Sequence, residues 1–273
     1  MAMAVADGAQ SGLRGDPRDQ LAVPLLLGGC LNGLLVRISE AWQTHGLESP
    51  LMGISPFEFL AMVIGARAIL TAPSSMKSPL LWPEAALCLA MLVPSSAFSW
   101  LAVLAYAVLE AWRAESGRRN GFLLFAALAV CSLWSSVLLK RIAGPVAALD
   151  AHLVWGMLSP LRPDISVTGN VVGVSDGHNL IIMTACTSAS LMPKALLGLA
   201  ALTMLAGGAT WQRLQFAVFA VATTCIGINL LRLSLMAWSG DVYGFIHGPV
   251  GANTFDAAQM LAVAACGLRA VRA

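Results

Sequence analysis

Charged residues are scarce in this chain of 273 residues. Asp, Glu, Lys and Arg make up only 11% of it, whereas an ordinary soluble domain contains roughly 25%. Apolar residue types account for 58%, so a soluble protein of this size would have too little charge to cover its surface. The composition therefore excludes a soluble enzyme, a disordered chain and a nucleic-acid-binding protein. It indicates a polytopic membrane protein that contacts the lipid bilayer.

Paired cysteines are also lacking. The six cysteines are scattered along the chain, and no two of them have the CxxC spacing. This pattern favours neither a disulfide framework nor a zinc site. The sequence contains no other metal-binding or cofactor-binding motif, so we expect no cofactor.

Long apolar runs occupy most of the chain. At about 20 residues per crossing, they predict an all-α helical bundle with about eight transmembrane helices. The predicted helices cover residues 21–41, 54–70, 79–94, 96–112, 121–141, 187–206, 212–238 and 252–269. We expect a single integral membrane domain over residues 21–273.

The positions of arginine residues predict the orientation in the membrane. Residues 1–20 are polar and are expected to form a disordered tail that contains Arg14 and Arg18. Arg269 and Arg272 follow the last predicted helix. Because cytoplasmic segments carry an excess of Lys and Arg, both termini are predicted to be cytoplasmic, which requires an even number of crossings.

Residues 142–185 differ from the predicted spans. Residues 143–158 are apolar but contain Asp150 and His152, which favours a helix that lies along the outer membrane surface. Residues 161–179 alternate turn-forming residues with β-branched ones. This second pattern predicts a small hairpin that caps the outer face of the bundle.

A candidate nucleophile lies where this outer segment meets the sixth predicted helix. Cys186 has the hydroxyl residues Thr184, Thr187, Ser188 and Ser190 around it, and these can cap the helix. The free N–H groups and positive dipole of a helix N-terminus stabilise a thiolate and can bind an oxyanion. Cys186 is therefore either a reactive thiol or, like the other five cysteines, a small apolar residue.

Two further ionisable side chains are predicted near the same face. Arg232 lies inside the seventh apolar run and cannot lose its charge. It either shares a polar pocket with Asn229, three residues earlier, or extends to the membrane surface. His247 lies in a glycine-rich stretch, 239–251, that we expect to be an outer loop, and His178 competes with it as a candidate base.

Together these residues indicate acyl-transfer chemistry. Cys186 can attack a carbonyl, His247 can accept and return the proton, and Arg232 can bind a carboxylate or an oxyanion. Asp256, near the start of the eighth predicted helix, is expected either to cap that helix or to orient His247.

In three stretches the chain resembles the exosortase/archaeosortase family of membrane transpeptidases. The stretches are Thr184-Ala185-Cys186-Thr187-Ser188, Asn229-Leu230-Leu231-Arg232 and His247-Gly248. The resemblance extends over residues 175–270 in its motifs. One departure is that the family has a small residue and a glycine after the cysteine, where this chain has Thr187 and Ser188. A glycine at this position would allow the substrate backbone to approach closely. We therefore expect Thr187 and Ser188 to lie against the substrate.

The resemblance implies an enzyme that acts on exported proteins. Their C-terminal sorting signal would consist of a short motif, a hydrophobic helix and a basic tail. Cys186, Arg232 and His247 would be the catalytic residues, and the cleaved protein would pass from a Cys thioester to an acceptor. The resemblance also implies an exopolysaccharide-associated enzyme of a bacterial inner membrane, with its active site on the periplasmic face.

Two other function classes remain open from the sequence. A membrane-bound acyltransferase would use His247 and would not need Cys186. A transporter or a non-catalytic component of an export system would use neither residue in catalysis. A transporter is disfavoured because the chain has no internal repeat, and its polar residues are predicted to gather at one face.

Overall fold

The computed structural model describes residues 17–45, 54–72, 82–93 and 95–272, and its fold is all-α apart from one small sheet. Each of the eight predicted apolar segments contains a helix. These helices are α1 (Pro17–His45), α2 (Pro56–Thr71), α3 (Trp82–Met91), α4 (Ser96–Arg113), α5 (Ser116–Leu133), α8 (Ser188–Leu205), α9 (Trp211–Trp238) and α11 (Pro249–Arg272). The all-α character of the predicted fold is therefore confirmed. Residues 1–16 of the predicted tail lie outside the described residues.

Three helical stretches of the described residues are long and apolar enough to cross a membrane. They are Ser116–Arg141, Ser188–Leu205 and Trp211–Trp238. The first combines α5 with the π-helical turn η2 (Trp134–Leu138) and α6 (Leu139–Arg141). By contrast, α3 has 10 residues, which correspond to roughly 15 Å, or about half the thickness of the hydrocarbon core. These three spans support a membrane protein.

The chain divides into two compact units. One covers Met1–Ile54 and Ala61–Val130, and the other covers Ser55–Leu60 and Cys131–Ala273. The apolar pattern of the sequence, which predicted one domain over residues 21–273, did not distinguish them. All the candidate site residues belong to the second unit.

In the first unit, small residues allow the helices to approach closely. A Cβ atom at Gly33 of α1 would lie 2.7 Å from the indole of Trp100 in α4. The neighbouring Asn32 donates hydrogen bonds to the carbonyls of Met91 and Val93, at 2.8 and 2.7 Å. Small residues that bring backbones together, with polar side chains bonded across the interface, are typical of helix packing in membranes.

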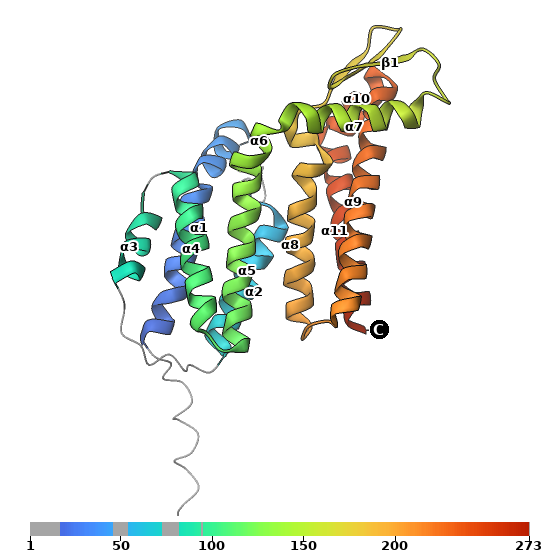
Figure 1. Cartoon of the computed structure of the whole chain (residues 1–273). Helices are drawn as coiled ribbons and strands as arrows, with labels where there is room; N and C mark the ends of the chain where they lie inside the picture. The colour runs from blue at the N-terminus through green and yellow to red at the C-terminus, as the bar shows by residue number, and fades with distance from the viewer. Residues whose placement is uncertain (1–16, 46–53, 73–81, 94, 273) are drawn as a thin grey trace, which may run out of the picture. The chain divides into compact units, whose positions relative to one another are not determined.

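In the second unit, α8, α9 and α11 pack side by side, and shorter elements gather at one end of them (Figure 1). We call this the capped end; Ser188, Trp238 and Pro249 lie there. At the opposite end, the far end, Gly207 and Gly208 turn the chain from α8 into α9 with φ values of 92° and 95°. Glycine adopts this left-handed conformation without the steric penalty of a Cβ atom.

The capped end carries α7 (Ala143–Leu158), which lies across the ends of the long helices (Figure 1). It is followed by an antiparallel sheet of β1 (Ile165–Thr168), β2 (Val171–Val174) and β3 (Asn179–Ile181), in the order β1-β2-β3. The structure thus contains the predicted helix over residues 143–158 and the predicted hairpin, and adds a third strand.

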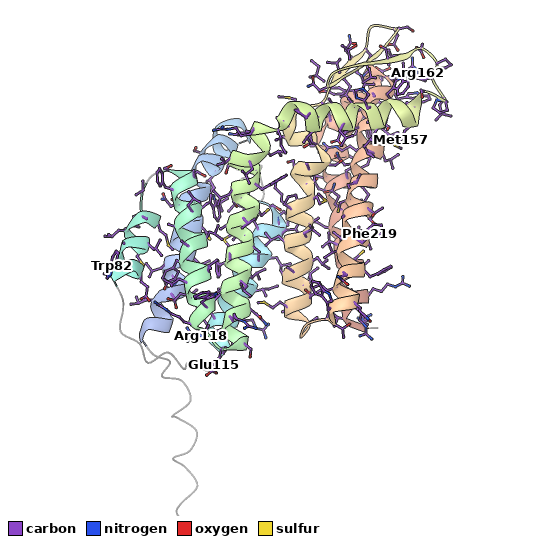
Figure 2. The ribbon with its side chains drawn as sticks, in the orientation of Figure 1. Trp82, Glu115, Arg118, Met157, Arg162 and Phe219 are labelled. Carbon is purple, nitrogen blue, oxygen red and sulfur yellow. The ribbon has the colours of Figure 1, made fainter. Side chains whose placement is uncertain are left out.

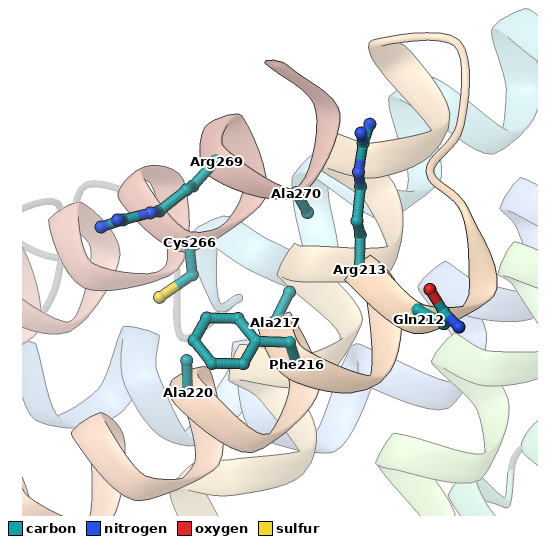
Figure 3. A pocket seen from close by; sticks show the side chains of 8 residues that line it. All are labelled: Gln212, Arg213, Phe216, Ala217, Ala220, Cys266, Arg269 and Ala270. Atoms are coloured by element: carbon teal, nitrogen blue, oxygen red, sulfur yellow. The ribbon is translucent and has the colours of Figure 1, made fainter. Parts of the chain in front are cut away.

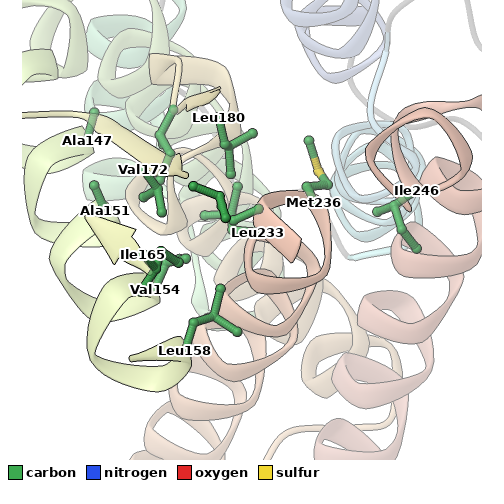
Figure 4. Close-up of a cluster of buried hydrophobic side chains, with 13 residues drawn as sticks. Ala147, Ala151, Val154, Leu158, Ile165, Val172, Leu180, Leu233, Met236 and Ile246 are labelled. Atoms are coloured by element: carbon green, nitrogen blue, oxygen red, sulfur yellow. The ribbon is translucent and has the colours of Figure 1, made fainter. Parts of the chain in front are cut away.

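An apolar cluster joins α7 and the sheet to α9 (Figure 4). Val154 of α7 and Val172 of β2 are fully buried, and Leu233 of α9 is nearly so. In β2, Val172 and Val174 face inward, while the residues before each of them are partly exposed. This alternation follows from the two-residue period of a strand, and it seats one face of the sheet on the bundle.

Arg162 links the loop before β1 to the end of α9 (Figure 2). Its guanidinium pairs with the carboxylates of Asp164 and Asp176, at 3.0 and 3.4 Å, and donates a hydrogen bond to the Trp238 carbonyl. Hydrogen bonds from Arg162 and Ser175 lower the pKa of Asp164 to about 2. The last carbonyls of a helix lack helical partners, and Arg162 supplies one.

The prediction of an outer loop over residues 239–251 is wrong. Residues Gly240–His247 form the helix α10, and α11 begins at Pro249. The Ser239 hydroxyl accepts a hydrogen bond from the Val242 amide and so caps α10. Serine at the N-cap and proline at the first helical position are both helix-start signals, and here they outweigh the glycines that suggested a loop.

Candidate functional site

Cys186 lies in a short turn that leads into α8. Residues Thr184–Cys186 form the 3-10 turn η3, and Thr187 is the N-cap residue of α8. The side chain of Cys186 is partly exposed and packs against the apolar cluster at the capped end. The sequence predicted this position immediately before the helix.

The cap of α8 differs from the predicted hydroxyl cap. The Thr187 hydroxyl makes no cap hydrogen bond and instead donates to the Thr184 carbonyl at 2.8 Å. A carboxylate oxygen of Asp150, from α7, accepts a hydrogen bond from the Ser188 amide at 2.8 Å. The expected cap is therefore wrong, because a residue 38 positions earlier in the chain takes over the helix N-terminus.

Asp150 is a buried acid, with 4% of its surface exposed. Burial raises the pKa of the Asp150 carboxyl, and the hydrogen bonds from Ser188 oppose that rise. When ionised, this carboxylate lies at the positive end of the α8 dipole, which stabilises it. The Ser188 amide is thus already bonded and is not free to bind an oxyanion.

Asn229 links the cysteine turn to α9. Its side-chain nitrogen donates to the Cys186 carbonyl at 3.0 Å and to the Ser188 hydroxyl at 3.1 Å. Asn229 is 1% exposed, so these bonds form in the interior of the unit. Thr187 and Ser188 are buried as well, and both hydroxyls bond within the protein. Ser188 therefore supports the turn at the position where the resembled family has glycine.

Arg232 lies three residues after Asn229 on α9 and about 4.5 Å further along the helix towards the capped end. It is partly exposed, and its Nε atom is buried without a hydrogen-bond partner among the described residues. A guanidinium carries five N–H donors and stays charged. Arg232 can therefore donate to an anionic or oxyanionic group of a ligand.

His247 is the last residue of α10 and is exposed. Its ring stacks on Tyr243, with the centroids 5.1 Å apart and an interplanar angle of 28°. The Tyr243 ring lies 5.9 Å from that of His178, whose Nε2 is 2.9 Å from the Met236 carbonyl. A carbonyl only accepts hydrogen bonds, so Nε2 of His178 carries a proton. His247, which makes no such bond within the described structure, is the better candidate base.

The three predicted catalytic residues lie at the same end of the second unit but are not bonded to one another. In the ranges that the structure describes, no hydrogen bond or ion pair joins Cys186, Arg232 and His247. Asp256 makes no bond to His247 there either. It lies inside α11, which begins at Pro249, so its predicted role as a helix cap is wrong.

Two residues of this site were missed in the sequence analysis. Asp150 is the one acidic residue within residues 143–158, and the sequence indicated only that its helix lies along the membrane surface. Tyr243 is one of only two tyrosines in the chain and stands four residues before His247. On a helix this spacing brings side chains together, but the predicted loop concealed it.

Comparison with protein-family models, with curated proteins and with solved structures gave no match. The resemblance to exosortases therefore depends on the three short stretches around Cys186, Arg232 and His247.

Proposed function

We propose that this protein is an exosortase-like cysteine transpeptidase that removes the C-terminal sorting signal of exported proteins. The observation that carries the proposal is the hydrogen bond from Asn229 to the Cys186 carbonyl. It matters because it fixes the turn that bears the candidate nucleophile to the helix that bears Arg232. Nucleophilic catalysis requires such a rigid relation between the attacking group and the groups that bind the substrate.

In the first chemical step, the sulfur of Cys186 attacks the carbonyl carbon of the scissile peptide bond. His247 accepts the thiol proton and then donates it to the leaving amine. The C–N bond breaks as the C–S bond of a thioester forms. The stacking of His247 on Tyr243 leaves both ring nitrogens at the edge of the ring, where they can transfer a proton.

Arg232 stabilises the negative charge that develops on the carbonyl oxygen during this attack. The partial exposure of Arg232 at the capped end supports this role, because a charged donor that is already near the reacting groups stabilises negative charge as it develops. Since the Ser188 amide is bonded to Asp150, the helix N-terminus supplies less of this stabilisation than its position suggests.

In the second step, an acceptor amine or water attacks the thioester carbon. The C–S bond breaks, the acceptor is joined to the exported protein, and the proton lost by the acceptor returns through His247 to the sulfur of Cys186. The enzyme is thereby restored. No cofactor takes part in either step.

The proposal includes about eight crossings of a bacterial inner membrane, with both termini in the cytoplasm and the capped end in the periplasm. Exposed apolar side chains support insertion in lipid: Phe216, Phe219 and Leu231 of α9 are 67%, 69% and 49% exposed. Phe219 points outward from α9 (Figure 2). Large apolar surfaces of this kind mark contact with a membrane or a partner.

A second candidate is a membrane-bound acyltransferase that uses His247. It is favoured by the exposure of His247 and by the lack of a bond to Cys186 within the described structure. In that enzyme His247 would activate an acceptor hydroxyl directly, and the sulfur of Cys186 would not react. Cys186→Ser separates the two functions, since it abolishes transpeptidation and leaves acyl transfer to a hydroxyl largely intact.

The experiment is coexpression with a target from the same genome that ends in a short motif, an apolar helix and an Arg-rich tail. Mass spectrometry of the target reports removal of the tail. We expect processing by the wild type and none by Cys186→Ala. Cys266→Ala is the matched control, because Cys266 is a partly exposed cysteine on α11 near the far end, and it should process normally.

Processing by Cys186→Ala at the wild-type rate would overturn the cysteine mechanism. If no target is processed, labelling with a membrane-impermeant maleimide gives a second test. Modification of Cys186 from the periplasmic side supports an accessible thiol at the capped end. Absent labelling of Cys186 contradicts it.

A further inference from the structure

A cavity of about 570 Å³ lies at the far end of the second unit, between α9 and α11. Its volume is within the range of small-molecule sites in proteins. Apolar side chains form much of its wall, and Figure 3 shows Phe216 and Cys266 directed towards each other from the two helices. Ala217 and Ala220 leave the space that a larger side chain would fill.

The edge of this cavity is basic. Arg213 at the start of α9 and Arg269 near the end of α11 both line it (Figure 3). Arg269 and Arg272 also line an adjoining cavity of about 380 Å³. Neither Arg269 nor Arg272 makes an ion pair or a hydrogen bond with another described residue. Within the described ranges, no acidic residue is among the side chains that line the two cavities, so Arg269 and Arg272 have no described counterion.

The residues around the cavity are typical of the depth at which lipid headgroups are found. Trp211, the first residue of α9, is 70% exposed. Exposed tryptophan beside arginine at the end of an apolar helix is typical of the membrane–water interface. α9 continues from there as one of the three candidate spans. The apolar part of the cavity thus faces the hydrocarbon region, and its basic edge lies at the level of the headgroups.

We propose that this cavity binds one anionic phospholipid. The phosphate lies against Arg269 and Arg272, with Arg213 nearby, and an acyl chain lies against Phe216, Ala220 and Cys266. Basic pockets between membrane helices bind anionic headgroups in this way. The basic tail of a sorting signal is a poor occupant, because its charge has the same sign as the arginines.

This site is at the opposite end of the unit from Cys186, so the inference does not depend on the proposed transpeptidase chemistry. We expect the site to bind anionic lipids more tightly than zwitterionic ones. An arginine near an anionic headgroup contributes about fivefold in affinity, so Arg269 and Arg272 together give roughly 25-fold tighter binding of an anionic than of a zwitterionic lipid.

The test is native mass spectrometry of the full chain, purified in detergent and stripped of lipid. It is titrated with phosphatidylglycerol or phosphatidylcholine, both with the same acyl chains. We expect one phosphatidylglycerol per chain, bound roughly 25-fold more tightly than phosphatidylcholine. The double variant Arg269→Gln/Arg272→Gln should lose this preference. Arg141→Gln, an exposed arginine at the other end of the unit, should keep it.

A second variant tests the acyl-chain part of the site. Ala220→Leu fills the cavity and should weaken the binding of both lipids, whereas the soluble headgroup analogue glycerol 3-phosphate should bind far more weakly than phosphatidylglycerol. Equal affinity for the two lipids, or a preference that survives the double arginine substitution, would overturn the proposal. Binding of glycerol 3-phosphate as tight as that of the whole lipid would also overturn it.

Discussion

The substitution Asp150→Ala removes the acceptor that caps α8. The Ser188 amide then remains buried without a partner, since Thr187 makes no cap bond and Ser188 is 8% exposed. An unsatisfied buried donor costs about 1–3 kcal/mol. At about 2–4 °C per kcal/mol for a domain of this size, the Tm should fall by roughly 2–12 °C.

The ionisation of Asp150 has a separate effect on the stability of the fold, and the direction of this effect can be tested. Burial raises the pKa of this carboxyl, so the folded state holds the proton more tightly than the unfolded state does. The wild type therefore loses stability as the pH rises from the ordinary carboxyl pKa through the raised one. Asp150→Asn keeps an acceptor for Ser188 but cannot ionise, so its Tm relative to the wild type should increase over that range.

Thermal unfolding in detergent, followed by intrinsic fluorescence at several pH values, measures both effects. Asp256→Ala is the control, because Asp256 is exposed in α11 and makes no hydrogen bond within the described residues; its Tm should change little. If Asp150→Ala unfolds at the wild-type temperature, Asp150 does not cap α8. If Asp150→Asn follows the pH dependence of the wild type, the carboxyl is not the titrating group.

Three further predictions concern the same unit. Asn229→Ala removes the bonds to the cysteine turn and should lower the unfolding free energy by about 1–3 kcal/mol; an unchanged Tm would contradict the network. Gly251→Ala should strongly lower the Tm in thermal unfolding, because its Cβ would lie 2.5 Å from the Ile246 backbone. The Cβ of Gly227→Ala would meet no described atom within 4 Å, so this substitution should stabilise α9 by roughly 0.5–1 kcal/mol. Equal effects of the two substitutions on the Tm would refute this prediction. Asp164 stabilises the fold above the ordinary carboxyl pKa, and this stabilisation should disappear as the pH falls through about 2. The hydrogen-exchange protection of β1 and β2 should therefore decrease over that range in the wild type but not in Asp164→Asn. A wild type whose protection depends on pH as little as that of Asp164→Asn would contradict this prediction.

The helices could be predicted from the sequence because long apolar runs carry their own signal. The placement of Cys186 before α8 followed in the same way, from the change between a polar segment and an apolar run. The hydrogen bond that caps α8 at the Ser188 amide could not be predicted. Its acceptor is Asp150 on a different helix, and only tertiary packing brings the two residues together.

The region around His247 was predicted less well for a different reason. Its glycines suggested a loop, although Ser239 and Pro249 are strong helix-start signals. Once α10 was missed, the stacking of His247 on Tyr243 could not be anticipated, because an i, i+4 contact requires a helix.

The measurement that tests the account most directly is a search for the acyl-enzyme. The full-length protein is incubated in membranes with a target that carries the C-terminal signal, then digested rapidly at acidic pH and mapped by mass spectrometry. The transpeptidase mechanism predicts a hydroxylamine-sensitive adduct on the peptide that contains Cys186. The wild type should form this adduct, and His247→Gln should form much less of it, because His247 also protonates the leaving amine. A target that is processed with its adduct on another residue, or is processed equally by Cys186→Ala, would contradict the account.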